Sequence, residues 1–148
     1  MNTKQSNFFP SFSLILVILV LLLIGFSSCR GDNIPLPNDF LVALNQVEAS
    51  GKHSGVSDGD GGRAKGPFQI HYRYWQDSGV TGSYSQCSDY NYSVLVVTGY
   101  MNRYARSAIR ARDYETLARV HNGGPNGMSH SDTLAYWKKF KKALTSAR

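Results

Sequence analysis

The sequence predicts a small, mostly helical domain of the α+β class with one short β-hairpin. Three observations carry this prediction. Apolar residues recur at helical spacing in most segments after residue 38. A stretch rich in glycine and aspartate at 52–65 interrupts them and is typical of a loop or a tight hairpin. No internal repeat and no second domain is visible in the 148 residues.

The first 29 residues are expected to be an export signal rather than part of the fold. Residues 13–26 form an apolar run that is shorter than the roughly 20 residues a membrane-spanning helix needs, with Lys4 before it and small residues after it. A signal peptide fits this pattern, and a single-pass anchor is the alternative. Phe26-Ser27-Ser28-Cys29 also resembles a bacterial lipobox, in which Cys29 would be lipidated and attach the protein to a membrane. We therefore expect an exported protein that is secreted, periplasmic or membrane-anchored.

The rest of the chain has the size of one small domain. Residues 30–37 contain two prolines and are predicted to be a tether, and residues 38–148 form the predicted domain. Cys87 is the only cysteine of that domain, so no disulfide is expected within it, and a Cys29–Cys87 bridge is the alternative. The apolar core is then expected to hold the fold on its own.

The chain is basic, with a formal net charge of +6. A basic surface favours anionic partners such as cell-wall polymers, nucleic acid or membrane surfaces. The run Lys138-Lys139-Phe140-Lys141-Lys142 falls on a predicted C-terminal helix, where it is expected to be a solvated face that also suits the helix dipole. The aromatic and basic pattern of a nucleic-acid-binding module is missing, so no nucleic acid partner is expected.

Four helices are predicted in the domain. The first has Asn38 or Asp39 as its N-cap and ends at Gly51. The second covers about 93–109 and the third 114–120, and the last starts near Ser131. Glycine and proline after the third helix enforce a sharp break.

Glu48 is the candidate catalytic acid. Helical spacing places it on or beside the buried face at the end of the first helix. Asp58 and Asp60 follow on the glycine-rich stretch, where glycine lets the backbone approach a ligand closely. Glycoside hydrolysis requires such a pair, one acid that is protonated and one carboxylate that is ionised. Turn chemistry and a calcium loop are the alternatives for the aspartates, although the later ligands of an EF-hand are missing.

Six segments together resemble the invertebrate-type (i-type) lysozymes, the destabilase family. They are residues 47–51, 66–70, 74–77, 100–104, 118–127 and 133–137. The most specific of them is His-Asn-Gly-Gly-Pro-Asn-Gly at 121–127, which is followed by Tyr136-Trp137. The segments keep the family's order along nearly the whole domain. The scarcity of cysteine departs from a usually disulfide-dense family and, with the lipobox, suggests a bacterial-style member.

The resemblance implies a lysozyme-like fold that hydrolyses the β-1,4 bond between N-acetylmuramic acid and N-acetylglucosamine in peptidoglycan glycan strands. It places the family's general acid on Glu48 and its aspartate on Asp60, in the small hairpin. Asp58 is the backup, because the spacing to the Gly-Pro-Phe-Gln-Ile block is one residue short. The candidate sugar contacts are Gln69, Tyr74, Asn122 and Gly123.

Other functions stay open at this point. A lytic transglycosylase needs only the acid–base glutamate and yields anhydro-muramic ends. Isopeptide cleavage, which is associated with some members of the family, would need a nucleophile–base pair that the sequence does not define. A non-catalytic domain would bind peptidoglycan without turnover. The four histidines show no metal-ligand spacing, so no metal or other cofactor is expected, and the protein is expected to be a monomer.

Overall fold

The computed structural model describes residues 32–146. A compact unit begins at Asn33. The predicted signal segment and its Cys29 lie outside the described residues. Within residues 32–146, no helix is long and apolar enough to cross a membrane.

The unit is mostly helical and carries one small antiparallel sheet, so the predicted α+β class is confirmed. Its α-helices between residues 33 and 146 are α2 (Asn38–Ala49), α3 (Tyr72–Ser78), α4 (Tyr90–Tyr104), α5 (Arg106–Ala111), α6 (Tyr114–Gly123) and α7 (Thr133–Ser146). Strands β1 (Ala64–Lys65) and β2 (Ile70–His71) pair with Ala64 opposite His71. Short 3-10 turns cover Asp60–Gly62, Gly66–Phe68, Tyr84–Ser88 and Gly127–Ser129.

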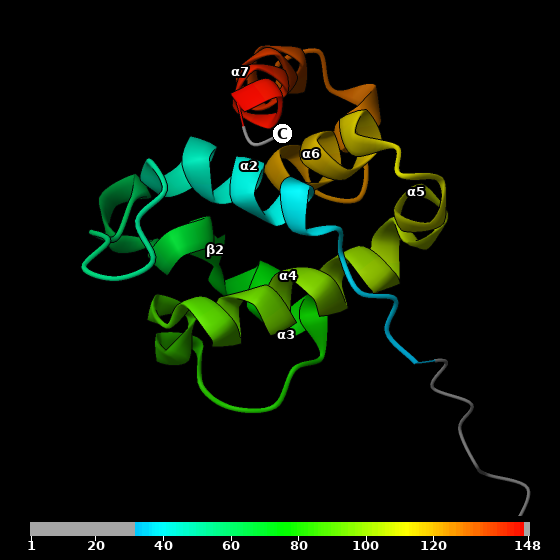
Figure 1. Ribbon diagram of the computed structural model, residues 1–148. Coiled ribbons are helices and arrows are strands. Elements are labelled where there is room, and N and C mark those ends of the chain that lie inside the picture. Colours follow the sequence, from blue (N-terminus) through cyan, green and yellow to red (C-terminus); the bar gives the residue numbers. More distant parts are fainter. Residues whose placement is uncertain (1–31, 147–148) are drawn as a thin grey trace, which may run out of the picture. The chain divides into compact units, whose positions relative to one another are not determined.

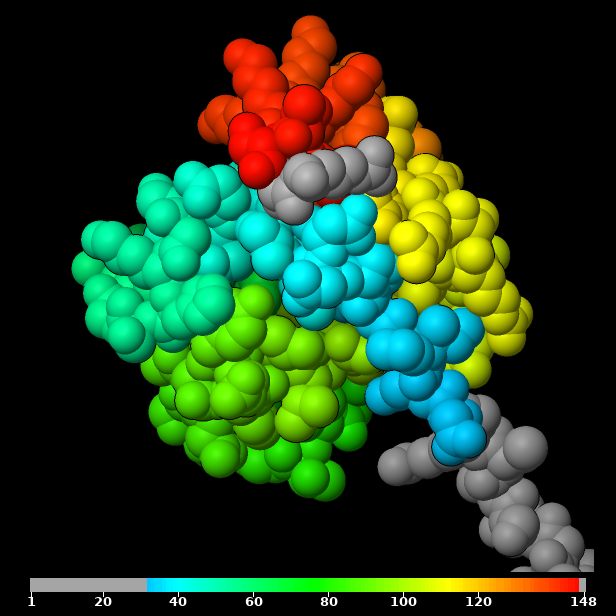
Figure 2. Space-filling view, in the orientation of Figure 1, coloured from blue at the N-terminus to red at the C-terminus, as the bar shows by residue number. Residues whose placement is uncertain are grey.

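Helix α2 organises the core. It packs against α7 on one side and against the Gly66–Phe68 turn on the other (Figure 1). Helix α4 also packs against that turn. Phe40 of α2 is fully buried, and its ring contacts the rings of Tyr114 and Phe140 at centroid distances of 5.7 and 5.2 Å. Figure 2 shows the outer side of α2 (cyan) next to α7 (red).

The helices differ from the prediction in several places, and α3 was not predicted as a helix. The helix expected over 93–109 is two helices, because Ala105, at φ −139° and ψ 32°, separates α4 from α5. No glycine or proline marks this break in the sequence. Helix α2 begins after Pro37 without a side-chain cap, so the predicted N-cap is wrong. The carboxylate of Asp39 instead accepts a 2.7 Å hydrogen bond from the hydroxyl of Tyr114.

The segment before α2 lies against the domain. The backbone N–H of Ile34 donates to Oδ1 of Asn102 (2.9 Å), and Nδ2 of Asn102 donates to the carbonyl of Ile34 (2.8 Å). Leu36 is buried in the core. The last residues of the expected 30–37 tether are therefore held by α4.

The Gly66–Phe68 turn passes very close to Cys87, which is a buried free thiol. Gly66 has φ 67°, and a Cβ at this position would lie 1.9 Å from the carbonyl oxygen of Cys87. Only glycine fits such an approach. The contact joins the turn that supports α2 to the 3-10 turn that leads into α4.

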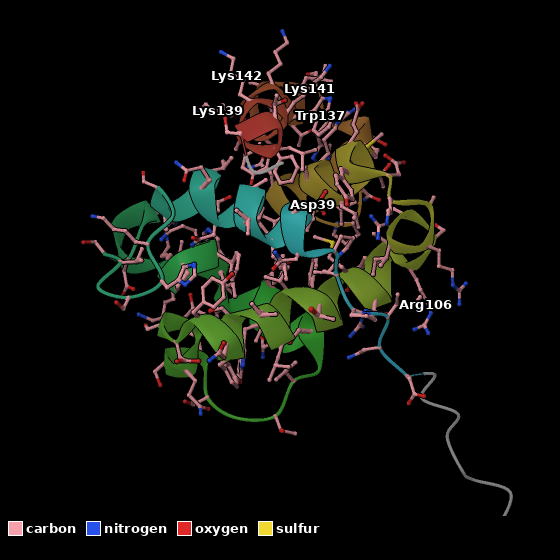
Figure 3. All side chains as sticks on the ribbon, viewed as in Figure 1. Asp39, Arg106, Trp137, Lys139, Lys141 and Lys142 are labelled. Atoms are coloured by element: carbon pink, nitrogen blue, oxygen red, sulfur yellow. The ribbon has the colours of Figure 1, made fainter. Side chains whose placement is uncertain are left out.

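The C-terminal lysines form an exposed face of α7. Lys138, Lys139, Lys141 and Lys142 are all exposed, and Figure 3 shows the last three on the outer side of that helix. The buried face of α7 carries Tyr136 and Phe140 instead. The charge of the run is thus directed away from the core, as the sequence predicted.

Candidate active site

Glu48 lies one residue before the end of α2, and its side chain is 17% exposed. Tyr136 of α7 donates a 2.5 Å hydrogen bond from its hydroxyl to Oε1 of Glu48. Tyr136 shares the buried face of α7 with Phe140, one turn further along. One carboxylate oxygen of Glu48 is therefore occupied inside the protein, which leaves Oε2 for chemistry.

Arg119 holds the connection that brings α7 to Glu48. This buried arginine donates from Nε to the hydroxyl of Thr133 (2.9 Å) and from Nη2 to the carbonyl of Met128 (2.8 Å). Its Nη1 pairs with Glu115 at 3.1 Å, so its charge is not left uncompensated. These bonds fix the start of α7 relative to α6.

His121 is a second neighbour of the Glu48 carboxyl and approaches the same oxygen as Tyr136. Its Nε2 is 3.6 Å from Oε1 of Glu48, and its Nδ1 is 3.0 Å from the hydroxyl oxygen of Tyr74. The ring of Tyr74 stacks on Tyr100 with a centroid distance of 3.6 Å. We infer that the Tyr74 hydroxyl donates to Nδ1, so that a neutral His121 carries its proton on Nε2, toward Glu48.

The two tyrosines of this network are held in their neutral, donating form. Burial raises the pKa of Tyr136 well above its ordinary value, and the charge of Glu48 and the hydrogen bond to it raise it further. Burial also raises the pKa of Tyr74, with smaller contributions from Tyr100 and Glu48. A neutral phenol is a hydrogen-bond donor. Both hydroxyls therefore keep the proton that the network uses.

Asp60 faces the site from the loop before β1. Its loop is closed by a bridge between Gly59 and Ala64, and Asp60 itself has φ 48°, a left-handed conformation that aspartate tolerates. Arg63 donates from Nη2 to Oδ1 of Asp60 (2.8 Å), and Nε2 of His71 is 3.7 Å from Oδ2. The Asp60 carboxylate thus lies between two basic groups.

Asp58, the backup for the second carboxylate, is placed differently. Its Oδ2 accepts a 2.5 Å hydrogen bond from Nζ of Lys65, a residue of β1. It does not line the cavity that contains Glu48. The structure therefore brings Asp60, and not Asp58, to the same cavity as Glu48.

Two amide side chains fix the Asp60 loop against α2. Gln69 donates to the carbonyl of Gly66 (2.9 Å), and its Oε1 lies so close to Gly59 that an added Cβ there would be 2.0 Å away. The buried Asn45 donates to the carbonyls of Lys52 (2.9 Å) and Pro67 (3.0 Å). The end of α2 and the loop are consequently held as one piece.

The side chains meet at a cavity of about 250 Å³. It is lined by Glu48, Asp60, Ala64, Gln69, His71, His121 and Asn122. A groove of about 410 Å³ between α2 and α7 is larger, but no carboxylate or histidine lines it. The chemistry therefore selects the smaller cavity. Among residues 32–146, no group of three or more histidine, cysteine, aspartate or glutamate side chains could hold a metal ion.

Of the predicted sugar contacts, Gln69 and Asn122 line this cavity, whereas Tyr74 and Gly123 do not. Tyr74 lies behind His121. Gly123 packs on α7, where an added Cβ would be 2.5 Å from Cγ2 of Thr133. Both residues support the site from outside its lining.

Sequence reasoning missed three contributors to the site. His71 lines the cavity beside Asp60, and Arg63 pairs with Asp60. Tyr136 contacts Glu48 although 88 positions separate them. The available signal was a tyrosine at a helix position where leucine or phenylalanine would fill a core, since a buried phenol needs a partner for its hydroxyl.

Two acidic residues facing one cavity of a small helical domain are the arrangement that a lysozyme-type glycoside hydrolase uses. Comparison with known proteins agrees with this class. The chain belongs to the Destabilase family, whose profile matches residues 39–143.

Curated relatives include lysozymes of several invertebrates. The invertebrate-type lysozyme of Ruditapes philippinarum is 40% identical over 105 residues, which cover 69% of this chain and 77% of that protein. The lysozyme of Magallana gigas is 45% identical over 76 residues, which cover 50% of this chain and 56% of that protein. The chain thus spans little more than half the length of the second relative.

Solved lysozyme structures have the same fold. The Tapes japonica lysozyme superposes with a TM-score of 0.61 at 37% identity, covering 72% of this chain and 89% of that one. The Meretrix lusoria lysozyme, in complex with Aeromonas hydrophila PliI, gives a TM-score of 0.61 at 31% identity with the same coverage.

Proposed function

We propose that the protein is a peptidoglycan β-1,4-glycosidase that cleaves between N-acetylmuramic acid and N-acetylglucosamine. One observation carries the proposal: Glu48, with one oxygen bound inside the protein by Tyr136, faces the same cavity as Asp60. The relatives' description as lysozymes supports the same reaction.

In the proposed mechanism, Glu48 is the general acid. It protonates the glycosidic oxygen from Oε2, because Oε1 already accepts the Tyr136 hydroxyl. Asp60 stabilises the oxocarbenium-like centre or attacks it, and Glu48 then activates the water that completes turnover. The environments suit these roles, since Glu48 is largely enclosed and Asp60 is exposed between Arg63 and His71.

The remaining side chains either bind the sugars or position the catalytic residues. We propose that Gln69 and Asn122 contact the sugars, because both line the cavity and both carry amides. Tyr74 acts through His121, and the Cβ-free Gly123 lets α6 approach α7 at the site. No step of this scheme requires a cofactor.

Export completes the proposal. The apolar run at 13–26 supports a signal segment, and the lipobox-like residues before Cys29 support lipidation and membrane attachment. Labelling with a clickable fatty acid tests the second point. Incorporation that is lost in Cys29→Ala is the expected result, and no incorporation overturns it.

We also propose that the protein is a monomer. Analytical ultracentrifugation of the purified protein tests this, and a single species of monomer mass is the expected result.

The function itself is tested by mass spectrometry of purified peptidoglycan after digestion. We expect fragments with reducing N-acetylmuramic acid ends, which disappear with Glu48→Gln, while Asp132→Asn, an exposed carboxylate outside the cavity, keeps activity. Anhydro-muramic ends would assign a lytic transglycosylase instead. Cut peptides would indicate isopeptide cleavage, and intact peptidoglycan retained on the protein would indicate a binding domain.

A further inference from the structure

A second cavity lies next to the proposed catalytic one. It has a volume of about 440 Å³ and is lined by Gly62, Arg63, His71, Tyr72, Arg73 and Tyr84. His71 lines both cavities, so the two are adjacent. A glycan strand bound between Glu48 and Asp60 would therefore have this second cavity beside it.

The aromatic wall of the second cavity is held in place. The hydroxyl of Tyr84 shares its proton between the carbonyls of Arg63 (2.6 Å) and Ile70 (2.8 Å), which holds the ring against the residue before β1 and the first residue of β2. Tyr72 meets Tyr84 edge to face at 5.4 Å and is nevertheless 52% exposed. A tyrosine left this exposed on a fixed neighbour offers a preformed apolar surface to a ligand.

The two arginines of the cavity differ in their partners. The guanidinium of Arg63 is already bound to the Asp60 carboxylate. Arg73 is exposed and forms no ion pair or hydrogen bond through its side chain with any residue between 32 and 146. Arg73 is thus the available cation, and a planar guanidinium is suited to bind a carboxylate.

Only one part of the proposed substrate offers that carboxylate. The alternating sugars of peptidoglycan are uncharged once the lactyl group of muramic acid is joined to its peptide. The peptide stems keep free carboxylates and carry small apolar side chains. We propose that this second cavity, through Arg73 and the Tyr72–Tyr84 wall, binds the peptide stem of the substrate by its free carboxylate. This inference rests on the proposed function.

The test measures binding with Glu48→Gln, which is expected to hold strands without cutting them. The probes are soluble peptidoglycan strands bearing free stem carboxylates, and the same strands with those carboxylates converted to amides. We expect the free-acid strand to bind roughly fivefold more tightly than the amidated one, the effect of one partly exposed charge-assisted contact. Adding Arg73→Gln should abolish this preference.

Two further variants make the test specific. Arg73→Lys, which keeps the charge but not the planar fork, should retain part of the preference. Arg110→Gln removes another exposed arginine, on α5 and outside this cavity, and should leave the preference intact. A preference that survives Arg73→Gln, or equal binding of both strands by Glu48→Gln alone, overturns the proposal.

Failure of this inference differs from failure of the proposed function. Strands that bind without charge discrimination, and that the unaltered protein cuts, would overturn only the stem-binding cavity. Strands that neither bind nor are cut would overturn the glycosidase assignment, and the inference with it.

Discussion

The hydroxyl of Tyr136 lies 2.5 Å from Oε1 of Glu48 and joins the C-terminal helix to the end of α2. The bond restrains the Glu48 side chain, which also lines the cavity. The catalytic geometry consequently depends on a residue that need not touch the substrate.

Replacing Tyr136 with phenylalanine tests this dependence. The change removes one oxygen and keeps the ring, so the core packing persists while Glu48 loses its fixed orientation. We expect kcat to fall about 10- to 100-fold, which corresponds to one hydrogen bond to a charged group, with KM little changed. Tyr104→Phe is the control, because no hydrogen bond of its hydroxyl joins it to residues 32–146. Equal kcat values for the two variants would show that the bond has no role in positioning.

The two aspartates of the loop should respond differently to amidation of their side chains. Asp60→Asn removes a carboxylate from the cavity, and we expect at least about a 100-fold loss of activity on peptidoglycan. Asp58→Asn removes an exposed pair with Lys65, and such pairs contribute roughly 1 kcal/mol or less, so activity should persist. Steady-state rates of the two variants decide which carboxylate serves the reaction. An active Asp60→Asn enzyme would remove Asp60 from the mechanism.

The tautomer of His121 provides a spectroscopic prediction. The Tyr74 hydroxyl should hold Nδ1 as an acceptor, so nitrogen-15 NMR should show the proton on Nε2. Tyr74→Phe keeps the stack on Tyr100 but removes the donor, and a mixture of tautomers is expected. A ring protonated on Nδ1 in the unaltered protein would contradict the inferred direction of the hydrogen bond.

The buried thiol of Cys87 predicts a loss of stability at alkaline pH. Burial raises its pKa from 9.0 to about 11, although the charge of Lys65 lowers it slightly. Between these values the folded thiol keeps a proton that the unfolded thiol has lost, so the free energy of unfolding falls as pH rises. From pH 9 to 11 the fall should be roughly 2 kcal/mol larger for the unaltered protein than for Cys87→Ala. Denaturant titrations at each pH measure the free energy of unfolding. An equal fall with pH in the unaltered protein and in Cys87→Ala would refute the prediction.

Gly66 and Gly61 form a matched pair, because their φ angles are 67° and 65°. Alanine at Gly61 meets open space and should cost only the left-handed conformation, about 1–2 kcal/mol. Alanine at Gly66 must also displace the backbone of Cys87, and the free energy of unfolding should fall by roughly 2–3 kcal/mol more. Thermal or urea unfolding compares the two. Similar losses would mean that the turn can shift away from Cys87.

Local patterns predicted the four longest helices and the position of Glu48, because helical periodicity is a property of neighbouring residues, but they did not predict α3. The same patterns could not reveal the break at Ala105, where no glycine or proline is present and where packing determines the backbone. Asp60 could be proposed from its spacing, yet its left-handed conformation and its pairing with Arg63 depend on the closed loop.

The contacts that complete the site are long-range, and a single sequence does not encode them in any local signal. Tyr74 shows this limit well. An aromatic residue near the catalytic segment suggested sugar stacking, but its ring is covered by Tyr100 and its hydroxyl is engaged by His121. Only the three-dimensional packing distinguishes a side chain that lines a cavity from one that supports the lining.

The paired hydrogen bonds between Ile34 and Asn102 have a mechanical consequence. Tension applied to the chain ahead of residue 33 meets these two bonds, of 2.9 and 2.8 Å, before it reaches Asn38, where α2 begins. The load passes into α4, and the helix that carries Glu48 is shielded from the pull. A pull on this segment therefore loads its contact with α4 before it acts on the first turn of α2.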